Sequence, residues 1–269
     1  MKPRESKSRK RLLLHIGLQK TGTTSLQALL QENKSALGRC AVYSYGADTQ
    51  NLRDAIRKWI SNPTKVNESA IQYIFGGYCL RFLKHSQGTI IFSDENILGR
   101  VLYDKSGDLI TWAEHILPRL IQMVPDEIDL EIVVYVRDSN RWLKSAYRQA
   151  VKRAKESRSF ETWTRQLPFS TNMSDITREI ESICCGVQCH VIEMENDLKI
   201  NGFVGGELLK LAGFQQSTLD ELSVPKPRNQ SLSWPAHVFM RIVNFLPLPD
   251  GVRMPISETI ETLDSRVRA

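Results

Sequence analysis

The chain has 269 residues, of which 41% are hydrophobic and 25% are charged. This composition is that of an ordinary folded protein, and it excludes a chain that is disordered throughout. Lysine and arginine number 36 against 30 aspartates and glutamates, so the formal net charge is +6 and an anionic partner is expected. At this length the chain can bury enough apolar surface to fold without disulfides or a structural metal.

The amino-terminal residues do not resemble a targeting or membrane segment. Residues 1–11 are basic, but the apolar stretch 12–16 is too short for a secretory signal, and no run reaches the roughly 18 apolar residues of a membrane span. The five cysteines are odd in number, which disfavours a disulfide framework. The sequence therefore predicts a cytoplasmic protein with a basic disordered tail over 1–10 and a single domain over 11–269. Whether the last ten residues form a second tail does not follow from the sequence.

Short β-rich runs alternate with longer helical patterns along the chain. This alternation predicts an α/β fold with three layers, αβα, around a central and mainly parallel sheet. In chain order the pattern predicts a strand over 11–16, a helix over 23–33, a strand over 40–45, helices over 52–60 and 69–83, a strand over 89–93, a helix over 109–123, a strand over 131–136 followed by a helix, a strand over 188–193, and a last helix opened by Ser233 and Pro235. The pair Gly76 and Gly77 is expected to interrupt the helix over 69–83.

The loop between the first strand and the first helix reads G-L-Q-K-T-G-T-T-S over residues 17–25. Free backbone N–H groups at the start of a helix attract anions. In the phosphate loop of nucleotide hydrolases a lysine follows the second glycine, but here Thr23 has that position and Lys20 lies inside the loop. The loop therefore predicts a phosphate cradle without a dedicated metal ligand, or else a tight turn with a solvated lysine. Its hydroxyl groups belong to Thr21, Thr23, Thr24 and Ser25.

A second cationic constellation begins at Arg137, at the carboxyl end of the strand over 131–136. Open α/β sheets bind their ligands at this edge. If Asp138 or Ser139 caps the next helix, a polar face forms opposite an apolar face that should be core. An arginine fork together with a serine hydroxyl can hold a phosphate monoester, although a solvated basic helix face is the alternative. The polar face contains Arg141, Ser145, Arg148 and Gln149, and the apolar face contains Trp142, Leu143 and Tyr147.

Together the two segments resemble the sulfotransferases that use 3′-phosphoadenosine-5′-phosphosulfate (PAPS). The stretch 15–27, H-I-G-L-Q-K-T-G-T-T-S-L-Q, resembles the 5′-phosphosulfate loop of that family. Arg137, followed eight positions later by Ser145, resembles its 3′-phosphate site. The resemblance covers roughly residues 11–150, and more faintly continues to the helix near 245. It implies a PAPS-binding fold related to the nucleotide kinases.

The resemblance also assigns roles to individual residues. It implies that Lys20 contacts the bridging region of the phosphosulfate and that Arg137 and Ser145 hold the 3′-phosphate. Arg228, in the basic and proline-rich loop 223–235, resembles the late loop with which family members cover the cofactor. The residues of the 5′ loop that it places against the cofactor are Gln19, Lys20, Thr21, Gly22, Thr23 and Thr24.

An acceptor hydroxyl must lose a proton as it attacks sulfur, so a general base is needed. In carbohydrate sulfotransferases a glutamate shortly after a strand does this work, and Glu95 is the matching position. Asp94 is the rival base, and the strand that ends in it can also be read as a Walker B strand whose aspartate binds magnesium. His15 and the cysteines near 184–190 are expected to be structural, because His15 belongs to an apolar strand and the cysteines lack metal-site spacing.

The sequence therefore predicts a metal-independent sulfotransferase. It moves the sulfuryl group of PAPS onto an acceptor hydroxyl, of a carbohydrate or related metabolite, and leaves 3′,5′-adenosine bisphosphate. The first alternative is a P-loop kinase or nucleotide hydrolase that uses ATP and magnesium. The second is a non-catalytic module that binds nucleic acid or an anionic surface through its basic faces. No nucleic-acid partner is expected, and neither the acceptor nor the oligomeric state follows from the sequence.

Overall fold

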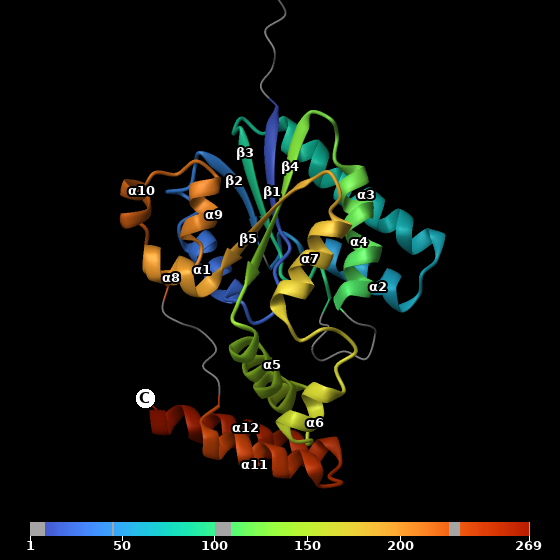
Figure 1. Ribbon diagram of the computed structural model, residues 1–269, viewed down its shortest axis with the longest axis vertical. Coiled ribbons are helices and arrows are strands. Elements are labelled where there is room, and N and C mark those ends of the chain that lie inside the picture. Colours follow the sequence, from blue (N-terminus) through green and yellow to red (C-terminus); the bar gives the residue numbers. More distant parts are fainter. Residues whose placement is uncertain (1–8, 45, 100–108, 226–231, 269) are drawn as a thin grey trace, which may run out of the picture.

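Five parallel strands form the centre of the molecule (Figure 1). The computed structural model describes residues 9–44, 46–99, 109–225 and 232–268. The strand order is β2-β3-β1-β4-β5, and each neighbouring pair is parallel. The strands are β1 (Lys10–His15), β2 (Cys40–Ser44), β3 (Thr89–Ser93), β4 (Ile128–Val136) and β5 (Gln188–Glu193). The predicted α/β fold with a parallel sheet is thus confirmed.

Helices cover both faces of this sheet, which is why its strands are continuous apolar runs. Successive residues of β1 point to opposite faces: Leu12 and Leu14 join one hydrophobic cluster, and Leu13 joins the other. The first cluster lies against α2 (Gln50–Ser61), α3 (Lys65–Lys84), α4 (Leu109–Met123) and α7 (Met173–Ile183), and the second against α1 (Thr23–Glu32), α8 (Met194–Asn201), α9 (Gly206–Leu211) and α10 (Gln216–Asp220). The three-layer αβα arrangement follows.

The predicted break in the third helix is wrong, because α3 runs without interruption from Lys65 to Lys84. Gly76 and Gly77 have no neighbour within 4 Å of the position where a Cβ would lie, so nothing forces the chain to turn there. The buried side chains of α3 lie on both sides of the pair, and their packing outweighs the low helix propensity of glycine. These buried residues include Ile71, Phe75, Tyr78, Cys79 and Phe82.

The tail expected over 1–10 is wrong at its end, because the sheet already includes Lys10, while residues 1–8 lie outside the described part. At the other end, the chain forms the helix α12 (Asp250–Arg268). It packs on α11 (Trp234–Phe245), and its Ile260 belongs to the same buried cluster as Met240 of α11. The side of α12 that packs on α11 is buried, and this burial stabilises the helix. The apolar pattern of the sequence alone is too weak to predict it.

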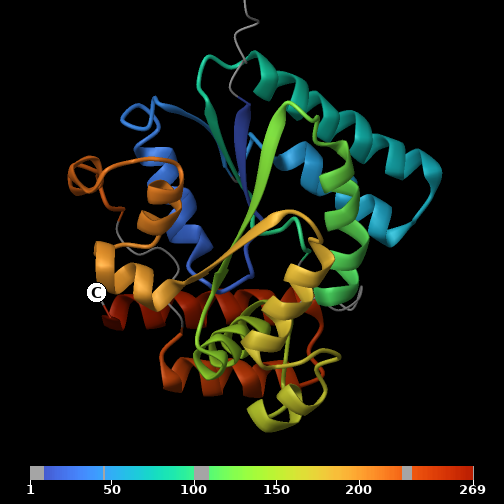
Figure 2. The same ribbon diagram turned by 45° about the horizontal axis from the view of Figure 1, so that its top comes forward.

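One end of the molecule is built beyond the carboxyl edge of the sheet. There α5 (Ser139–Arg153) and α6 (Phe160–Arg165) lie next to α11 and α12, as both ribbon views show (Figures 1 and 2). The apolar face predicted for α5 is buried, with Trp142 1% exposed. Among the described residues, no helix is both long enough and apolar enough to cross a membrane.

Candidate functional site

The loop between β1 and α1 turns sharply at three points. Gly17 has φ 45°, Lys20 has φ 70° and Gly22 has φ 85°, all in the left-handed region. Gly22 has no room for a side chain, because a Cβ there would lie 2.9 Å from the sulfur of Met194. The first N–H groups of α1 have no acceptor within the helix, and its first turn contains no acidic residue. The loop therefore presents a positive helix end to an anion.

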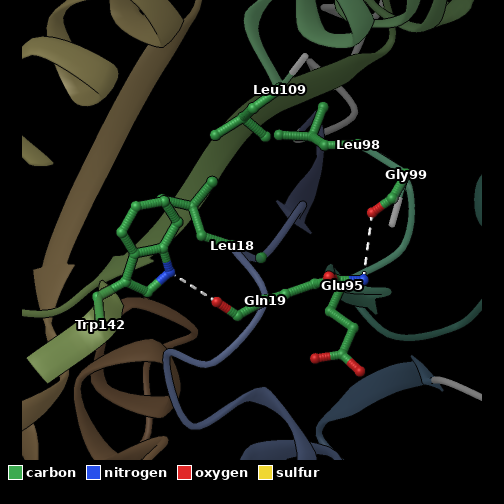
Figure 3. Close-up of a pocket in the computed structure, with 8 residues that line it drawn as sticks. Leu18, Gln19, Glu95, Leu98, Gly99, Leu109 and Trp142 are labelled. Atoms are coloured by element: carbon green, nitrogen blue, oxygen red, sulfur yellow. Dashed lines mark hydrogen bonds between the residues drawn. The ribbon is translucent and has the colours of Figure 1, made fainter. Parts of the chain in front are cut away.

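Four side-chain hydrogen bonds hold this loop in place. The indole Nε1 of Trp142 donates a hydrogen bond to the carbonyl oxygen of Gln19 at 2.8 Å (Figure 3). The amide Nε2 of Gln19 donates to Asn96 Oδ1 at 3.2 Å and to the Gly99 carbonyl at 3.3 Å. The buried hydroxyl of Thr21 donates to the Leu18 carbonyl at 2.5 Å. The side chains of Gln19 and Thr21 thus support the loop itself, although the sequence placed both against a ligand.

Glu95 lies directly against this loop, on the turn that follows β3. The hydroxyl of Thr23 donates a hydrogen bond to its carboxylate. Burial raises the pKa of Glu95, while the bond from Thr23 and the positive charge of Lys20 oppose this shift. Burial lowers the pKa of Lys20, and the negative charge of Glu95 opposes that shift in turn. The structure therefore places the predicted lysine and the predicted base in one electrostatic environment.

Asp94 has a different environment from its neighbour. Its carboxylate is fully buried and accepts hydrogen bonds from the Thr49 hydroxyl at 2.5 Å and from the backbone N–H of Asn96 at 2.9 Å. The guanidinium Nε of Arg53, which is 2% exposed, lies 3.5 Å from Asp94 Oδ2. Burial raises the pKa of Asp94, and these hydrogen bonds and the arginine oppose the shift. The carboxylate of Asp94 is thus occupied by contacts within the fold, which weighs against a role as a magnesium ligand.

Asp94→Asn is therefore expected to affect stability. The variant removes the carboxylate charge that lies 3.5 Å from the buried Arg53, and breaking a buried pair costs about 3–5 kcal/mol. We expect about 2 kcal/mol, below the 3–5 range, because burial already disfavours the Asp94 charge. The measurement is the free energy of unfolding in urea. Asp54→Asn is the matched control, since Asp54 and Arg57 are paired on the exposed side of α2 at 3.5 Å. Equal effects of the two changes would contradict the prediction.

His15 is a core residue, as predicted. Its side chain is fully buried at the end of β1, and its Nδ1 lies 2.8 Å from the Ser93 hydroxyl. The ring of Tyr135 meets it edge to face. Burial lowers the pKa of His15 to about 3, so the ring is neutral at physiological pH. The neutral ring therefore provides no positive charge to attract an anion and no negative charge like that of Glu95.

Arg137 leaves the end of β4 beside the first turn of α5. Asp138 caps α5 by accepting a hydrogen bond from the backbone N–H of Arg141 at 2.9 Å. The positive charge of Arg137 contributes to the lowered pKa of Lys20, so the two predicted cationic groups act on the same region. Ser145 follows one turn after Arg141 on the same face of α5 and is half-buried. Arg228 lies outside the described residues.

The sequence analysis missed Glu195, on the first turn of α8. Its Oε1 accepts a hydrogen bond from Arg137 Nε at 3.0 Å and lies 3.8 Å from an Nη atom of Arg141. A signal for this residue was present, because it directly follows the predicted strand over 188–193 and so lies at the same sheet edge as Arg137.

A small pocket opens beside the loop (Figure 3). One wall is apolar, and the carboxylate of Glu95 extends away from that wall. Trp112 backs the pocket, since its ring would lie 2.4 Å from a Cβ at Gly99. By contrast, Tyr43 and Tyr78 pack around Phe92 in the core. The residues that line the pocket are Gly17, Leu18, Gln19, Glu95, Leu98, Gly99, Leu109 and Trp142.

The donor set at this edge suits an anionic ligand with phosphate groups. It consists of a helix start, one lysine and two arginines, and these groups bind phosphate oxygens well. Within the described part of the chain, no three histidine, cysteine, aspartate or glutamate side chains gather as metal ligands would.

The comparisons with known proteins add a similarity of shape. No protein-family model matches the sequence, and no curated protein matches it. Among solved structures, a sulfotransferase from Alicyclobacillus acidocaldarius is similar in fold with a TM-score of 0.42. The two sequences are 14% identical, and the superposition covers 87% of this chain and 90% of that one. The function of this chain therefore has to be inferred from its own side chains.

Proposed function

We propose that this protein is a sulfotransferase that uses PAPS and transfers its sulfuryl group to an acceptor hydroxyl. One observation carries the proposal: Lys20, Glu95 and Arg137 follow the carboxyl ends of the neighbouring strands β1, β3 and β4, and the charges of Glu95 and Arg137 both act on Lys20. A base beside a cationic phosphate loop, with a second cation nearby, matches a donor that has anionic groups at both ends. The loop resemblance supports the same donor.

The chemistry is group transfer with one proton to move. PAPS supplies the activated sulfuryl group, so a bond from sulfur to the acceptor oxygen forms as the bond from sulfur to the 5′-phosphate oxygen breaks. Glu95 takes the proton of the acceptor hydroxyl, and its raised pKa favours this role at neutral pH. Lys20 and the N–H groups of α1 stabilise the charge on the departing phosphate, which leaves as part of 3′,5′-adenosine bisphosphate.

The remaining residues bind and orient. The backbone N–H groups of Thr21, Gly22 and Thr23 and the hydroxyl group of Thr24 hold the 5′-phosphate in this proposal. Thr24 is exposed and Thr23 is already bonded to Glu95, so Thr23 also links the phosphate loop to the base. Gln19 contributes through the position of its backbone, which Trp142 fixes. Arg137 and Ser145 hold the 3′-phosphate, and Arg228 remains a proposed third contact.

The acceptor is proposed to be a carbohydrate or a related metabolite. This choice rests on the position of Glu95 after β3, which resembles the position of the base in carbohydrate sulfotransferases. The proposed location is the cytoplasm, on the grounds that the cysteines number five and all are free.

Calorimetric titration tests the proposal against its rivals. The full chain is titrated with 3′,5′-adenosine bisphosphate and with ATP, each with and without magnesium. The expected result is that the bisphosphate binds more tightly and that magnesium makes no difference. Tighter binding of ATP with magnesium would replace the proposal by a kinase or nucleotide hydrolase. Binding to both that disappears with salt, without preference for the 3′-phosphate, would indicate a non-catalytic anion-binding module.

Arg137→Ala is expected to weaken binding of 3′,5′-adenosine bisphosphate by about 10- to 100-fold, the usual effect of losing a hydrogen bond to a charged group. Binding of adenosine 5′-monophosphate should not change, because it lacks the 3′-phosphate. Arg178→Ala is the control, since Arg178 is exposed on α7 and pairs within its own helix. An equal loss of affinity for both nucleotides would remove Arg137 from the 3′-phosphate site.

A further inference from the structure

Glu195 lies between the two arginines at the start of α5. It is 3.0 Å from Arg137 Nε and 3.8 Å from an Nη atom of Arg141. The side chains of Arg137 and Glu195 are 25% and 28% exposed, so this pair is partly shielded from water, whereas Arg141 is 66% exposed. Arg137 is therefore the better defined of the two contacts.

The start of α8 is placed by the sheet. Strands β4 and β5 are parallel, and Val136 pairs with Glu193, so the chain leaves both strands at the same edge. Met194 is buried, and its sulfur lies against Gly22 of the phosphate loop. Two consecutive residues of α8 thus contact both proposed halves of the donor site: Met194 supports the loop and Glu195 holds Arg137.

The contact occupies only part of the guanidinium. Its Nε donates to Glu195, and neither Nη atom of Arg137 has a hydrogen-bond partner among the described residues. A guanidinium has five donors in a planar fork, so a carboxylate on Nε leaves the two Nη atoms for a second anion. A long arginine side chain that is already oriented loses less conformational freedom when a ligand binds.

We propose that Glu195 is a positioning residue that orients Arg137 for the 3′-phosphate and so sets the preference for a 3′-phosphorylated nucleotide. The inference rests on the proposed function, because it assigns the 3′-phosphate to Arg137. The negative charge of Glu195 also repels a phosphate. Since the carboxylate oxygen bonds to Nε and leaves the Nη atoms accessible, orientation outweighs this repulsion.

Two substitutions separate orientation from charge. Glu195→Gln keeps an oxygen that can accept from Arg137 Nε but removes the charge, whereas Glu195→Ala removes both. Calorimetry on the full chain with 3′,5′-adenosine bisphosphate is expected to show about a tenfold loss of affinity for the alanine variant, the effect of one hydrogen bond to a charged group. The glutamine variant should stay within about threefold of the unmodified protein, because its bond to Arg137 remains. Glu193→Gln, an exposed carboxylate two residues away, is the control and should have no effect.

Adenosine 5′-monophosphate and Arg137→Ala complete the test. The alanine variant should bind the monophosphate normally, and Glu195→Ala should have no further effect on the bisphosphate once Arg137 is alanine. Tighter binding of the bisphosphate by both Glu195 variants would overturn the inference and make Glu195 a competitor of the phosphate. Equal weakening for both nucleotides would also overturn it, because the residue would then be merely structural. An unmodified protein that binds neither nucleotide overturns the proposed function itself.

Discussion

Turnover by the Lys20→Ala variant is expected to fall by about 10²–10³, the usual effect of removing one group that stabilises charge in a transition state. Lys20 lies inside the loop and beside Glu95, where burial lowers its pKa and the carboxylate opposes that shift. In the proposed reaction its positive charge is needed most when the phosphate departs. Affinity for 3′,5′-adenosine bisphosphate should therefore change much less than turnover. The measurements are initial rates of sulfuryl transfer from PAPS and calorimetric affinities.

The controls for Lys20 distinguish charge from backbone effects. Its φ of 70° disfavours alanine as much as lysine, so the alanine variant should fold normally. Lys20→Arg keeps the positive charge and should retain more turnover than the alanine variant. Lys58→Ala removes an exposed lysine from α2 and should leave turnover unchanged. Unchanged turnover in Lys20→Ala, with unchanged folding, would remove Lys20 from the proposed mechanism.

Glu95→Gln is expected to lower turnover by about 10² or more while cofactor affinity is kept, since general-base assistance is worth about 10²–10⁴ in rate. Glutamine still has an oxygen that can accept the hydrogen bond from Thr23, so the loop should keep its shape. Glu179→Gln, on the exposed side of α7, is the matched control. If Glu95→Gln kept full turnover, the base would have to be another group.

The raised pKa of Glu95 gives this variant a second, independent readout. Activity of the unmodified protein should rise with pH through a pKa above the ordinary value of 4.5, because the base must be ionised. The free energy of unfolding should change in the opposite direction and fall as pH rises. Below the pKa of the unfolded chain both states are protonated, and as pH rises through the higher folded-state pKa the buried charge destabilises the fold. Glu95→Gln should therefore be more stable than the unmodified protein at neutral pH but not at pH 4.

Thermal unfolding at the two pH values checks this sign. The prediction holds if Glu95→Gln melts at a higher temperature than the unmodified protein at neutral pH and if this difference becomes smaller at acidic pH. That result would agree with a buried Glu95 that is charged at neutral pH. A variant that is less stable than the unmodified protein at both pH values would show instead that the glutamate is part of the structural framework, as Asp94 is.

The sequence was most informative where local pattern and tertiary role coincide. The strand over 89–93 and the helix over 109–123 have the predicted bounds, because their apolar runs are buried as the pattern suggests. The short helices α6 and α8–α10 have five to eight residues, too few to show a period, and the sequence analysis missed them. The last helix, α12, depends on packing against α11, and local sequence does not contain that information.

In the candidate site too, some features could be predicted from the local sequence and others depend on tertiary contacts. The order of strands and loops was sufficient to bring Lys20, Glu95 and Arg137 to one edge of the sheet, because the ends of parallel strands meet there. Side-chain partners were not predictable, since they depend on elements distant in sequence. Trp142 was predicted to be core, and it is buried, but its indole N–H also fixes the phosphate loop from 123 residues away.

The two carboxylates after β3 occupy unlike surroundings although they are adjacent. On the turn that follows β3, Asp94 faces inward to Thr49 and Arg53, while Glu95 faces Thr23. Deleting one residue from this turn would change the direction of both carboxylates, so that Glu95 would no longer face Thr23 and Asp94 would no longer face Arg53. Spacing at this point is therefore as restrictive as residue identity, and insertions should be tolerated elsewhere on the surface before they are tolerated here.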